Sequence, residues 1–443
     1  MMNAARLVGT TLCFLAMPAV AQTGIAEVDS ADVAREAYGR AAAALRANDL
    51  PKARTEMTRA AIAWPTQPAY VWGRAIVSAR SGDTASTLAA LSDYAALGLG
   101  RDVSSNPTFA AFRGAPGFAA VSARLDSNRA PLARSTVRAT LPDSTFWPEG
   151  MDYDPRTATF YVASVRHRTV AAIHPNGNTR ELWPRSQPNM GAMLGVRVDA
   201  KHNALWITTS GVKQMNGYAP ADSSIAALIR LDIKDGAITR RWNLPAVKGG
   251  HVLGDLAIGP DGDVYVSDSS EPVLYRLRPG ADTLEHFMHP LFRSLQGMAP
   301  TPDGRALYVA DYSHGLLHVD LATRSVTRVA DAPHSTSLGC DGIAWYDGAI
   351  VCVQNGVAPA RVVRFVLDAT GTRIVRDEVL DQNTTLAGEP TIGAVVGDHF
   401  VYVANSQWDE YDDDGRRLPN STLSAPRLLS VLLSASSPRA RPR

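Results

Sequence analysis

The hydrophobic pattern divides the chain into two parts with different periodicities. Between residues 32 and 127, apolar and small residues recur at three- and four-residue spacing, which predicts amphipathic helices. The first stripe consists of Ala37, Tyr38, Ala41, Ala44 and Leu45. After a turn at residues 48–51, with Pro51 suited to the first turn of a helix, the second stripe consists of Ala53, Met57, Ala60, Ala61 and Trp64.

This helical pattern returns after 34 residues, which relates Tyr38 to Trp72, Ala41 to Ala75 and Asp49 to Asp83. The period resembles that of the tetratricopeptide repeat, in which small residues let paired helices pack closely. We therefore expect a tetratricopeptide-like helical region over residues 22–130, with a third helical pair around Phe109, Phe112 and Phe118. Such a region either caps the rest of the protein or docks a protein partner, and the pattern leaves both open.

From Ser135 onward, short β-rich runs alternate with turn signals. One strand recurs six times, at residues 160–164, 205–209, 264–268, 307–311, 350–354 and 401–405. Each follows a shorter strand and a turn such as Asp261-Gly262, and no crossover helices intervene. The repeat predicts a mainly β fold, a six-bladed β-propeller over residues 135–435, because blades bury both faces only when arranged in a ring. Residues 135–141 should add an outer strand beside residues 428–434, and residues 436–443 should form a disordered tail.

Residues 1–21 have the pattern of a secretory signal peptide. Arg6 precedes an apolar run from Leu7 to Val20, and Ala19-Val20-Ala21 fits a cleavage site before Gln22. The alternative is an uncleaved anchor helix, for which the run is short against ~30 Å of hydrocarbon. No later stretch approaches about 18 apolar residues, so we predict a periplasmic or secreted protein without a membrane span.

The charge balance and the missing motifs exclude several classes of function. The formal net charge is +1, which provides no attraction for nucleic acid or an anionic membrane. The sequence contains no G-x-S-x-G, H-E-x-x-H, P-loop or dinucleotide-binding motif. No C-x-x-C is present, which disfavours cysteine-bound zinc.

Two cysteines, Cys340 and Cys352, lie outside the signal segment, on either side of a predicted hairpin turn at Asp347-Gly348. Export would permit a disulfide between them. A tight two-residue turn, however, pairs Cys352 with Ile343 rather than with Cys340. We therefore favour two separate buried thiols over a bridge.

The first residues of the repeats form one ring when the blades are aligned by their turns: Glu149, Leu194, Gly254, Gln296, Asp341 and Thr391. Inner strands of a propeller converge on its central channel, so these side chains should meet at the mouth. Glu149, Gln296 and Asp341 offer hard oxygen ligands, which suit Ca²⁺ or Mg²⁺. The alternative is a structural role, with the acids hydrogen-bonded to neighbouring backbone N–H groups.

Short motifs at these positions resemble the senescence marker protein/gluconolactonase/luciferin-regenerating enzyme family, within the calcium-dependent phosphotriesterase-like propellers. They are Pro148-Glu149-Gly150, Gly254-Asp255, Gln296-Gly297, Pro302-Asp303-Gly304 and Asp341-Gly342, and the resemblance spans about residues 140–435. It implies a divalent cation, Ca²⁺ first, held by Glu149, Gln296 and Asp341. In the family the cation polarises a lactone or ester carbonyl and activates water. Gln296 stands where the family has Asn, and Gly254 where it has a substrate-binding Asn.

Resemblance and position together define candidate roles at the mouth. Asp341 or Asp255 would handle the proton, and Trp147, Arg197 and His251 would contact a small-molecule substrate, with a surface ion pair and a solvated histidine as the alternatives for the last two. The resulting hypothesis is a metal-dependent hydrolase of a lactone or ester. The second hypothesis is a non-catalytic propeller that binds a small ligand or peptide while the helical region docks a protein partner.

The acidic run Asp409–Gly415 follows the last repeat and lacks the ligand spacing of an EF-hand loop. We interpret it as a solvated loop. The stretch 408–418 is also a candidate lid over the channel.

Overall fold

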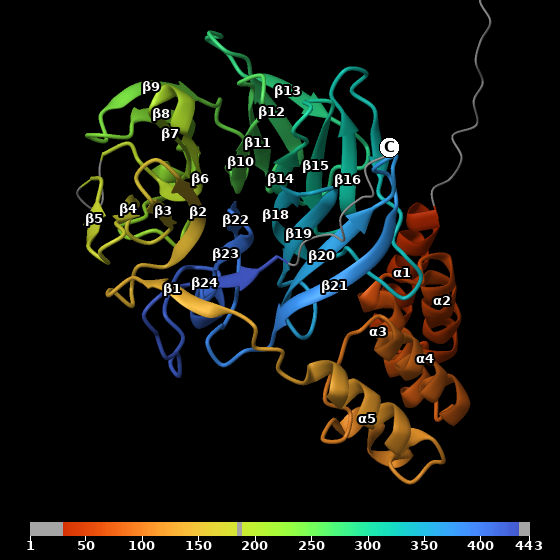
Figure 1. The fold of residues 1–443 in the computed structure, drawn as a ribbon. Coiled ribbons are helices and arrows are strands. Elements are labelled where there is room, and N and C mark those ends of the chain that lie inside the picture. The colour runs from red at the N-terminus through yellow and green to blue at the C-terminus, as the bar shows by residue number, and fades with distance from the viewer. Residues whose placement is uncertain (1–29, 184–187, 434–443) are drawn as a thin grey trace, which may run out of the picture.

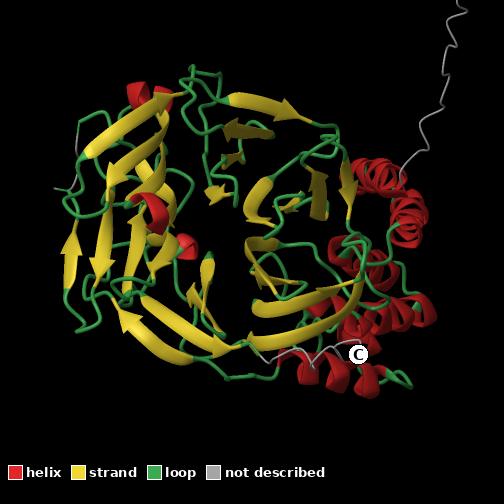
Figure 2. Ribbon diagram, turned by 45° about the horizontal axis from the view of Figure 1, so that its top comes forward, coloured by secondary structure: helices red, strands yellow, loops and turns green. Residues whose placement is uncertain are grey.

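The computed structural model describes residues 30–183 and 188–433. The predicted signal peptide (1–21) and C-terminal tail (436–443) lie outside these residues. A helical region comes first in the chain and is followed by a ring of six four-stranded sheets, which is the predicted six-bladed propeller. Figure 1 shows the helices beside the blades that contain β14–β21, and Figure 2 shows the sheets arranged around a common centre.

Over its described residues, from Ser30 onward, the helical region contains five α-helices and one 3₁₀ helix. They are α1 (Ser30–Arg46), α2 (Leu50–Ala63), α3 (Pro68–Arg80), α4 (Thr84–Ala96), η1 (Pro107–Phe112) and α5 (Phe118–Arg129). The 34-residue repeat has a direct structural counterpart, because Asp49 and Asp83 are both N-caps. The Asp49 carboxylate accepts from the N–H of Lys52, and that of Asp83 accepts from the N–H of Ser86.

The third helical unit differs from the expected pair of helices. Phe109 and Phe112 lie in η1, and only Phe118 begins an α-helix. The short Gly114-Ala-Pro-Gly117 segment between them breaks the helical path, because Gly117 has a left-handed conformation (φ 88°). All three phenylalanines are nevertheless buried in one core with α3 and α4.

The first three blades follow one another along the chain. The first contains β2 (Pro148–Asp154), β3 (Thr159–Ser164), β4 (Thr169–Ile173) and β5 (Thr179–Glu181). The second contains β6 (Ala192–Asp199), β7 (Ala204–Ser210), β8 (Ala226–Asp232) and β9 (Ile238–Asn243). The third contains β10 (Asp255–Ile258), β11 (Val264–Asp268), β12 (Val273–Leu277) and β13 (Glu285–Met288). Short 3₁₀ helices at η2 (Ala200–His202) and η3 (Pro220–Ser224) lie in loops of the second blade.

The remaining blades complete the ring. The fourth contains β14 (Leu295–Pro300), β15 (Ala306–Asp311), β16 (Gly315–Asp320) and β17 (Val326–Arg328). The fifth contains β18 (Cys340–Tyr346), β19 (Ala349–Gln354), β20 (Arg361–Leu367) and β21 (Ile374–Gln382). The sixth contains β22 (Gly393–Val396), β23 (His399–Val403), β24 (Arg427–Leu432) and, as its outer strand, β1 (Thr136–Thr140). The antiparallel pairing of β1 with β24 confirms the predicted closure.

Hydrophobic side chains fill the spaces between neighbouring blades. Each of the six interfaces has its own buried cluster; for example, Leu205 and Val170 belong to the cluster between the first two blades, and Val351 and Phe400 to that between the last two. A blade therefore buries both faces only against its neighbours, which makes closure of the ring necessary for the core.

Four inner strands carry a β-bulge at the mouth of the channel. The pairing register shifts in β2, β6, β14 and β18, where two residues of the inner strand oppose one residue of its partner. These two residues are Glu149-Gly150, Leu194-Gly195, Gln296-Gly297 and Asp341-Gly342. A Cβ on Gly297 would lie 2.5 Å from the carbonyl oxygen of Asp341 in the next blade. The glycines thus let neighbouring inner strands approach closely, while the bulges redirect the side chains that precede them.

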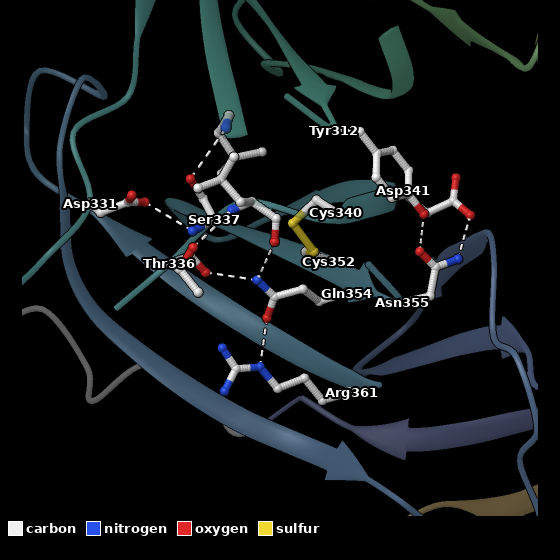
Figure 3. The surroundings of a disulfide bond; sticks show 12 residues. Tyr312, Asp331, Thr336, Ser337, Cys340, Asp341, Cys352, Gln354, Asn355 and Arg361 are labelled. Carbon is white, nitrogen blue, oxygen red and sulfur yellow. Dashed lines mark hydrogen bonds between the residues drawn. A yellow bond between two sulfur atoms is a disulfide. The ribbon is translucent and has the colours of Figure 1, made fainter. Parts of the chain in front are cut away.

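The bulge in β18 also overturns the expectation of two separate thiols. Cys352 does pair with Ile343, as the hairpin predicted, but Cys340 and Cys352 form a disulfide with an S–S distance of 2.03 Å (Figure 3). In a regular strand, Cys340 and Ile343 would face opposite sides, because side chains alternate. The extra residue moves Cys340 to the face of Cys352 and brings their Cα atoms to 5.8 Å.

The helical region packs against the fourth and fifth blades. Thr66 Oγ1 donates to Asp331 at 2.8 Å, and the N–H of Gly100 donates to the carbonyl of Ala358 at 3.0 Å. Leu338 joins a buried cluster with Trp64 and Tyr70. Within the described residues, no helix is long and apolar enough to cross a membrane.

Candidate functional site

Glu149 and Asp341 begin the bulges of β2 and β18 and lie at the same mouth of the channel. Glu149 Oε2 accepts a hydrogen bond from Nε1 of Trp408 at 2.7 Å. Asp341 Oδ2 accepts one from Nδ2 of Asn355 at 2.8 Å (Figure 3). Glu149 Oε1 and Asp341 Oδ1 accept no hydrogen bond from the described residues. Each carboxylate is therefore oriented through one oxygen and keeps the other available.

The two carboxylates oppose each other's ionisation. Burial raises the pKa of Asp341 to about 7, and the nearby Asp255 and Glu389 add to the rise, whereas the Asn355 hydrogen bond opposes it. Burial raises the pKa of Glu149, and repulsion from Asp341 raises it further, although the residue is still partly exposed to solvent. The hydrogen bond from Trp408 works in the opposite direction. Negative charge is therefore unfavourable at the mouth, and neither carboxylate pairs with a cationic side chain of the described residues.

Gln296, the expected third ligand, begins the bulge of β14, whose neighbour on one side is β18. Its Nε2 donates to Ser294 Oγ at 3.3 Å, and the side chain is only partly buried. Across the described ranges, no three His, Cys, Asp or Glu side chains gather closely enough to hold a metal ion. A cation at this mouth would therefore need amide oxygens beside the carboxylates of Glu149 and Asp341.

Asp255 and Arg197 form an ion pair inside the ring. Nη2 of Arg197 donates to Oδ2 of Asp255 at 2.9 Å, and Nη1 donates to the carbonyls of Val196 and Met151. Asp255 is 1% exposed, and its Oδ1 has no hydrogen-bond partner. Burial raises the pKa of Asp255 and Arg197 lowers it, with burial dominant. The pair joins the first three blades, so both candidates already make structural contacts.

Trp147 lies beneath the loop between β23 and β24 of the sixth blade. Its ring stacks on Tyr411 with centroids 4.1 Å apart and meets the edge of Trp408 at 5.0 Å. The side chain is fully buried, and its Nε1 has no hydrogen-bond partner. Trp147 therefore supports the residues over the mouth, while Trp408 contacts Glu149 directly.

His251 is 3% exposed, and both of its ring nitrogens have partners. Nδ1 lies 2.5 Å from Oδ2 of Asp268, and Nε2 lies 2.8 Å from the carbonyl oxygen of Pro245. The Asp268 carboxylate raises the pKa of His251, against the effect of burial. This geometry gives His251 a role in holding the loop before β10.

The loop that contains the acidic run extends from the sixth blade over the first two. Arg166 donates to the carbonyl of Gly415 at 3.1 Å and lies over the ring of Tyr411, while Lys213 pairs with Asp414 at 2.7 Å. The 3₁₀ helix η4 (Trp408–Glu410) places Trp408 against Glu149. This arrangement fits the position expected of a cover for the mouth.

Three residues of the site are not among the sequence candidates: Tyr312, Asn355 and Glu389. The Tyr312 hydroxyl donates to Oδ1 of Asn355, whose amide in turn orients Asp341. Tyr312 and Asn355 each follow the second strand of a blade directly. Aligning the residues that come one position after each repeated strand would have identified Tyr312 and Asn355 as candidates.

The sequence of residues 147–387 matches the family model described as SMP-30/Gluconolactonase/LRE-like region. No curated protein matches the sequence.

Solved structures are similar to parts of this chain at low sequence identity. Regucalcin, described as a calcium-binding protein, from Agrobacterium tumefaciens is 17% identical, with a TM-score of 0.45 over 67% of this chain and 95% of that one. A gluconolactonase from Xanthomonas campestris is 16% identical, with a TM-score of 0.44 over 69% and 92%. Virginiamycin B lyase from Staphylococcus aureus is 14% identical, with a TM-score of 0.44 over 60% and 81%.

The family match covers more than half of the chain and includes both Glu149 and Asp341. It supports a lactonase-like propeller, in agreement with the resemblance that the short mouth motifs indicated. The protein belongs to the SMP-30/gluconolactonase/LRE-like family.

Proposed function

We propose that this protein is an exported hydrolase of a lactone or related ester that depends on a divalent cation. The observation that carries the proposal is the pair formed by Glu149 and Asp341. Both face one channel mouth and each is oriented by a single hydrogen bond. The pKa of each is raised by burial, and repulsion from Asp341 raises that of Glu149 further. Two such carboxylates are what a cation-binding site requires before the cation arrives.

The chemistry of the donors fits a hard cation. Glu149 and Asp341 lie within electrostatic reach of each other, and both lie within reach of Asp255 and Glu389. Of these four acids, Arg197 contacts only Asp255 directly and so offsets the charge of that carboxylate. A divalent cation held by Glu149 and Asp341, with Gln296 as an amide donor, would offset the remaining charge. Oxygen-only ligands favour Ca²⁺ or Mg²⁺ over thiophilic metals.

The bound cation would supply a Lewis acid for the substrate carbonyl and lower the pKa of water. The chain's own residues would orient the groups and move the proton. Asn355 donates a hydrogen bond to Oδ2 of Asp341. This contact fixes the orientation of the carboxylate and leaves Oδ1 available. In the cation-free protein the pKa of Asp341 is raised to about 7. A bound cation would lower this pKa, so that Asp341 would be an ionised carboxylate able to accept a proton at neutral pH.

The first test is calcium binding by chelator-treated protein. Calcium at millimolar concentration should raise the melting temperature, because a ligand bound only by the native state stabilises it. Asp341→Asn should abolish the rise. Asp413→Asn, which changes an exposed acid of the acidic loop, is the matched control and should leave it intact. No rise in the wild type, or an equal rise in Asp341→Asn, would remove the metal site.

The second test is turnover of a panel of lactones and aryl esters by the same proteins. Wild type and Asp413→Asn should hydrolyse at least one class of substrate, and Asp341→Asn should lose activity by a factor of 100 or more, on the order of the general-base contribution. Equal turnover by wild type and Asp341→Asn would place the reaction elsewhere.

The ion pair between Arg197 and Asp255 favours a second candidate, a propeller that binds a small ligand without catalysis. The pair occupies Asp255, and Gly254 provides no side chain where the family has a substrate-binding Asn. Calcium-dependent stabilisation without turnover of any panel substrate would support this candidate over the hydrolase.

Export forms a separate part of the proposal and depends on residues 1–21. When the full-length chain is produced in a Gram-negative host, the periplasmic fraction should contain a protein that begins at Gln22. N-terminal sequencing measures this directly. An intact Met1 in the cytoplasmic fraction would contradict export without affecting the proposed chemistry.

A further inference from the structure

A cavity of about 760 Å³ lies between the helical region and the propeller. Helices α1 and α3 form one wall, with Tyr38, Tyr70 and Trp72 among the lining residues. Tyr312 and Gly356 contribute from the fourth and fifth blades. The volume is within the range of about 300–1,000 Å³ typical of pockets for small organic ligands. The cavity is distinct from the ring of Glu149 and Asp341.

Aromatic rings dominate the helical wall. Tyr38 stacks on Tyr70 with centroids 4.9 Å apart, and Trp72 packs against Tyr94 at 5.1 Å. Tyr38 is 39% exposed, although it belongs to the apolar stripe of α1. The other aromatic residues of the wall already pack against neighbours. Tyr38 therefore offers the aromatic face that is open to a ligand.

The charge of the lining is entirely positive. Among the described lining residues, Arg35 and Arg101 are the charged ones. Arg35 pairs with Asp32 and contacts His314. Arg101 lies over the Trp72 ring at 5.1 Å and donates through Nε to the Tyr94 hydroxyl at 3.1 Å, and no described carboxylate pairs with it. Its outer guanidinium N–H groups are therefore free to bind an anion.

We propose that this cavity binds a small organic anion in which a flat aromatic ring carries a carboxylate. The ring would lie against the exposed Tyr38, and the carboxylate would accept hydrogen bonds from Arg101. A guanidinium that is already stacked on an indole has little freedom left to lose, which favours recognition of a planar carboxylate. The absence of acids from the described lining removes the repulsion that such a ligand would meet at the channel mouth.

One residue of the cavity is connected by hydrogen bonds to the channel mouth. Tyr312 lines the cavity, and its hydroxyl donates to Asn355, which orients Asp341. The binding site itself does not depend on hydrolysis or on a bound cation. It can therefore be tested in chelator-treated protein, independently of the proposed function.

The probe for the test is 2-naphthoate, with the uncharged 2-naphthamide as its matched neutral analogue. Isothermal titration and quenching of tryptophan fluorescence measure their affinities for the full chain. We expect saturable binding of 2-naphthoate at least 10-fold tighter than that of 2-naphthamide. No saturable binding of 2-naphthoate at millimolar concentration, or equal affinity for the amide, would overturn the proposed ligand class.

Two pairs of variants locate the site. A side chain at Gly39 would enter open space, since an added Cβ meets no atom within 4 Å. Gly39→Trp should fill the cavity and weaken 2-naphthoate binding more than 10-fold, whereas Gly39→Ala should leave it unchanged. Arg101→Gln should weaken binding about 10-fold, and Arg80→Gln, an exposed arginine of α3 outside the cavity, should not.

Unchanged affinity in both Gly39→Trp and Arg101→Gln would assign the probe to another place and refute the cavity site. Melting curves of all four variants separate loss of binding from loss of fold. Because Arg101 is exposed, Arg101→Gln keeps the test decisive even where the larger substitution disturbs α1.

Discussion

Nε1 of Trp408 donates a hydrogen bond to Oε2 of Glu149 at 2.7 Å, across the position where the last blade meets the first. Trp408 belongs to the loop after β23, and Glu149 begins the bulge of β2. Closure of the ring thus brings together residues separated by 259 positions. The contact favours the ionised form of Glu149 and so opposes the effect of burial.

Replacing Trp408 should therefore weaken calcium binding. In Trp408→Phe the carboxylate of Glu149 loses a hydrogen bond, its pKa rises further, and protons compete more strongly with the cation. A hydrogen bond to a charged group contributes about 1.5–3 kcal/mol, so calcium affinity should fall at least 10-fold at pH 6 and less at pH 8. Calorimetric titration across this pH range measures the effect. Trp345→Phe, in the fifth blade, is the control; identical pH profiles for all three proteins would contradict the role of Trp408.

The raised pKa of Asp341 predicts how stability depends on pH without calcium. A carboxyl group that titrates near 7 in the folded state and near 4 when unfolded binds more protons when folded. The free energy of unfolding should therefore be highest below pH 4 for this group and decrease as pH rises toward 7, by roughly 2–4 kcal/mol. Urea unfolding in EDTA at pH 5 and 7.5 measures the difference. Asp341→Asn should remove most of it and Asp413→Asn none; a wild type that gains stability over this range would disprove the assignment.

Breaking the ion pair of Arg197 and Asp255 should destabilise the propeller. Asp255→Asn leaves a buried guanidinium without its counter-charge, which costs about 3–5 kcal/mol. Removing both charges in Arg197→Met/Asp255→Leu should recover a large part of that loss. Urea midpoints of the single and double variants provide the comparison. If Asp255→Asn keeps wild-type stability and loses only turnover, Asp255 acts in catalysis and its contact with Arg197 is secondary.

His251 should contribute to stability and not to substrate affinity. Its pKa is raised by Asp268, so the pair's contribution is complete below about pH 6.5, the unfolded value, and is lost as pH rises through the higher folded value. His251→Asn should lower the free energy of unfolding by about 1–3 kcal/mol at pH 6 and leave KM unchanged. Thermal unfolding and steady-state kinetics of one preparation test both statements. An increased KM at unchanged stability would restore His251 to the substrate site.

Removal of the disulfide between Cys340 and Cys352 should lower stability to a moderate degree. The bridge spans 12 positions, and closing a loop of that size in the unfolded chain corresponds to about 3 kcal/mol. The double variant Cys340→Ser/Cys352→Ser should show this loss in guanidinium unfolding. Wild type treated with reductant should behave like the double variant; a midpoint that neither change affects would mean that the bridge does not form in solution.

The ring of blades and most of its mouth could be read from local sequence. A strand like that at residues 307–311, preceded by a turn, repeats in every blade because each blade packs against its neighbours in the same way. Aligning these repeats placed Glu149, Gln296 and Asp341 in equivalent positions, and the structure keeps them so. The 34-residue helical repeat was equally legible, since Asp49 and Asp83 cap equivalent helices.

The contacts of individual side chains could not be predicted from the sequence in the same way. The sequence placed Arg197 and His251 at the mouth, and the structure gives them buried partners in Asp255 and Asp268. Those contacts join neighbouring strands or blades whose spacing no local pattern specifies. Asn355 escaped notice because one asparagine after a strand has no periodic signal of its own.

The sequence by itself determined the number and order of the blades, because periodic burial and turn chemistry act over a few residues and leave a mark in each repeat. The tertiary structure alone decided where the side chains point. One extra residue in β18 turns Cys340 toward Cys352 and directs Asp341 to the mouth, and ring closure brings Trp408 to Glu149. A bulge and a closure are set by the fit of neighbouring blades, and that fit exists only when the whole ring has assembled.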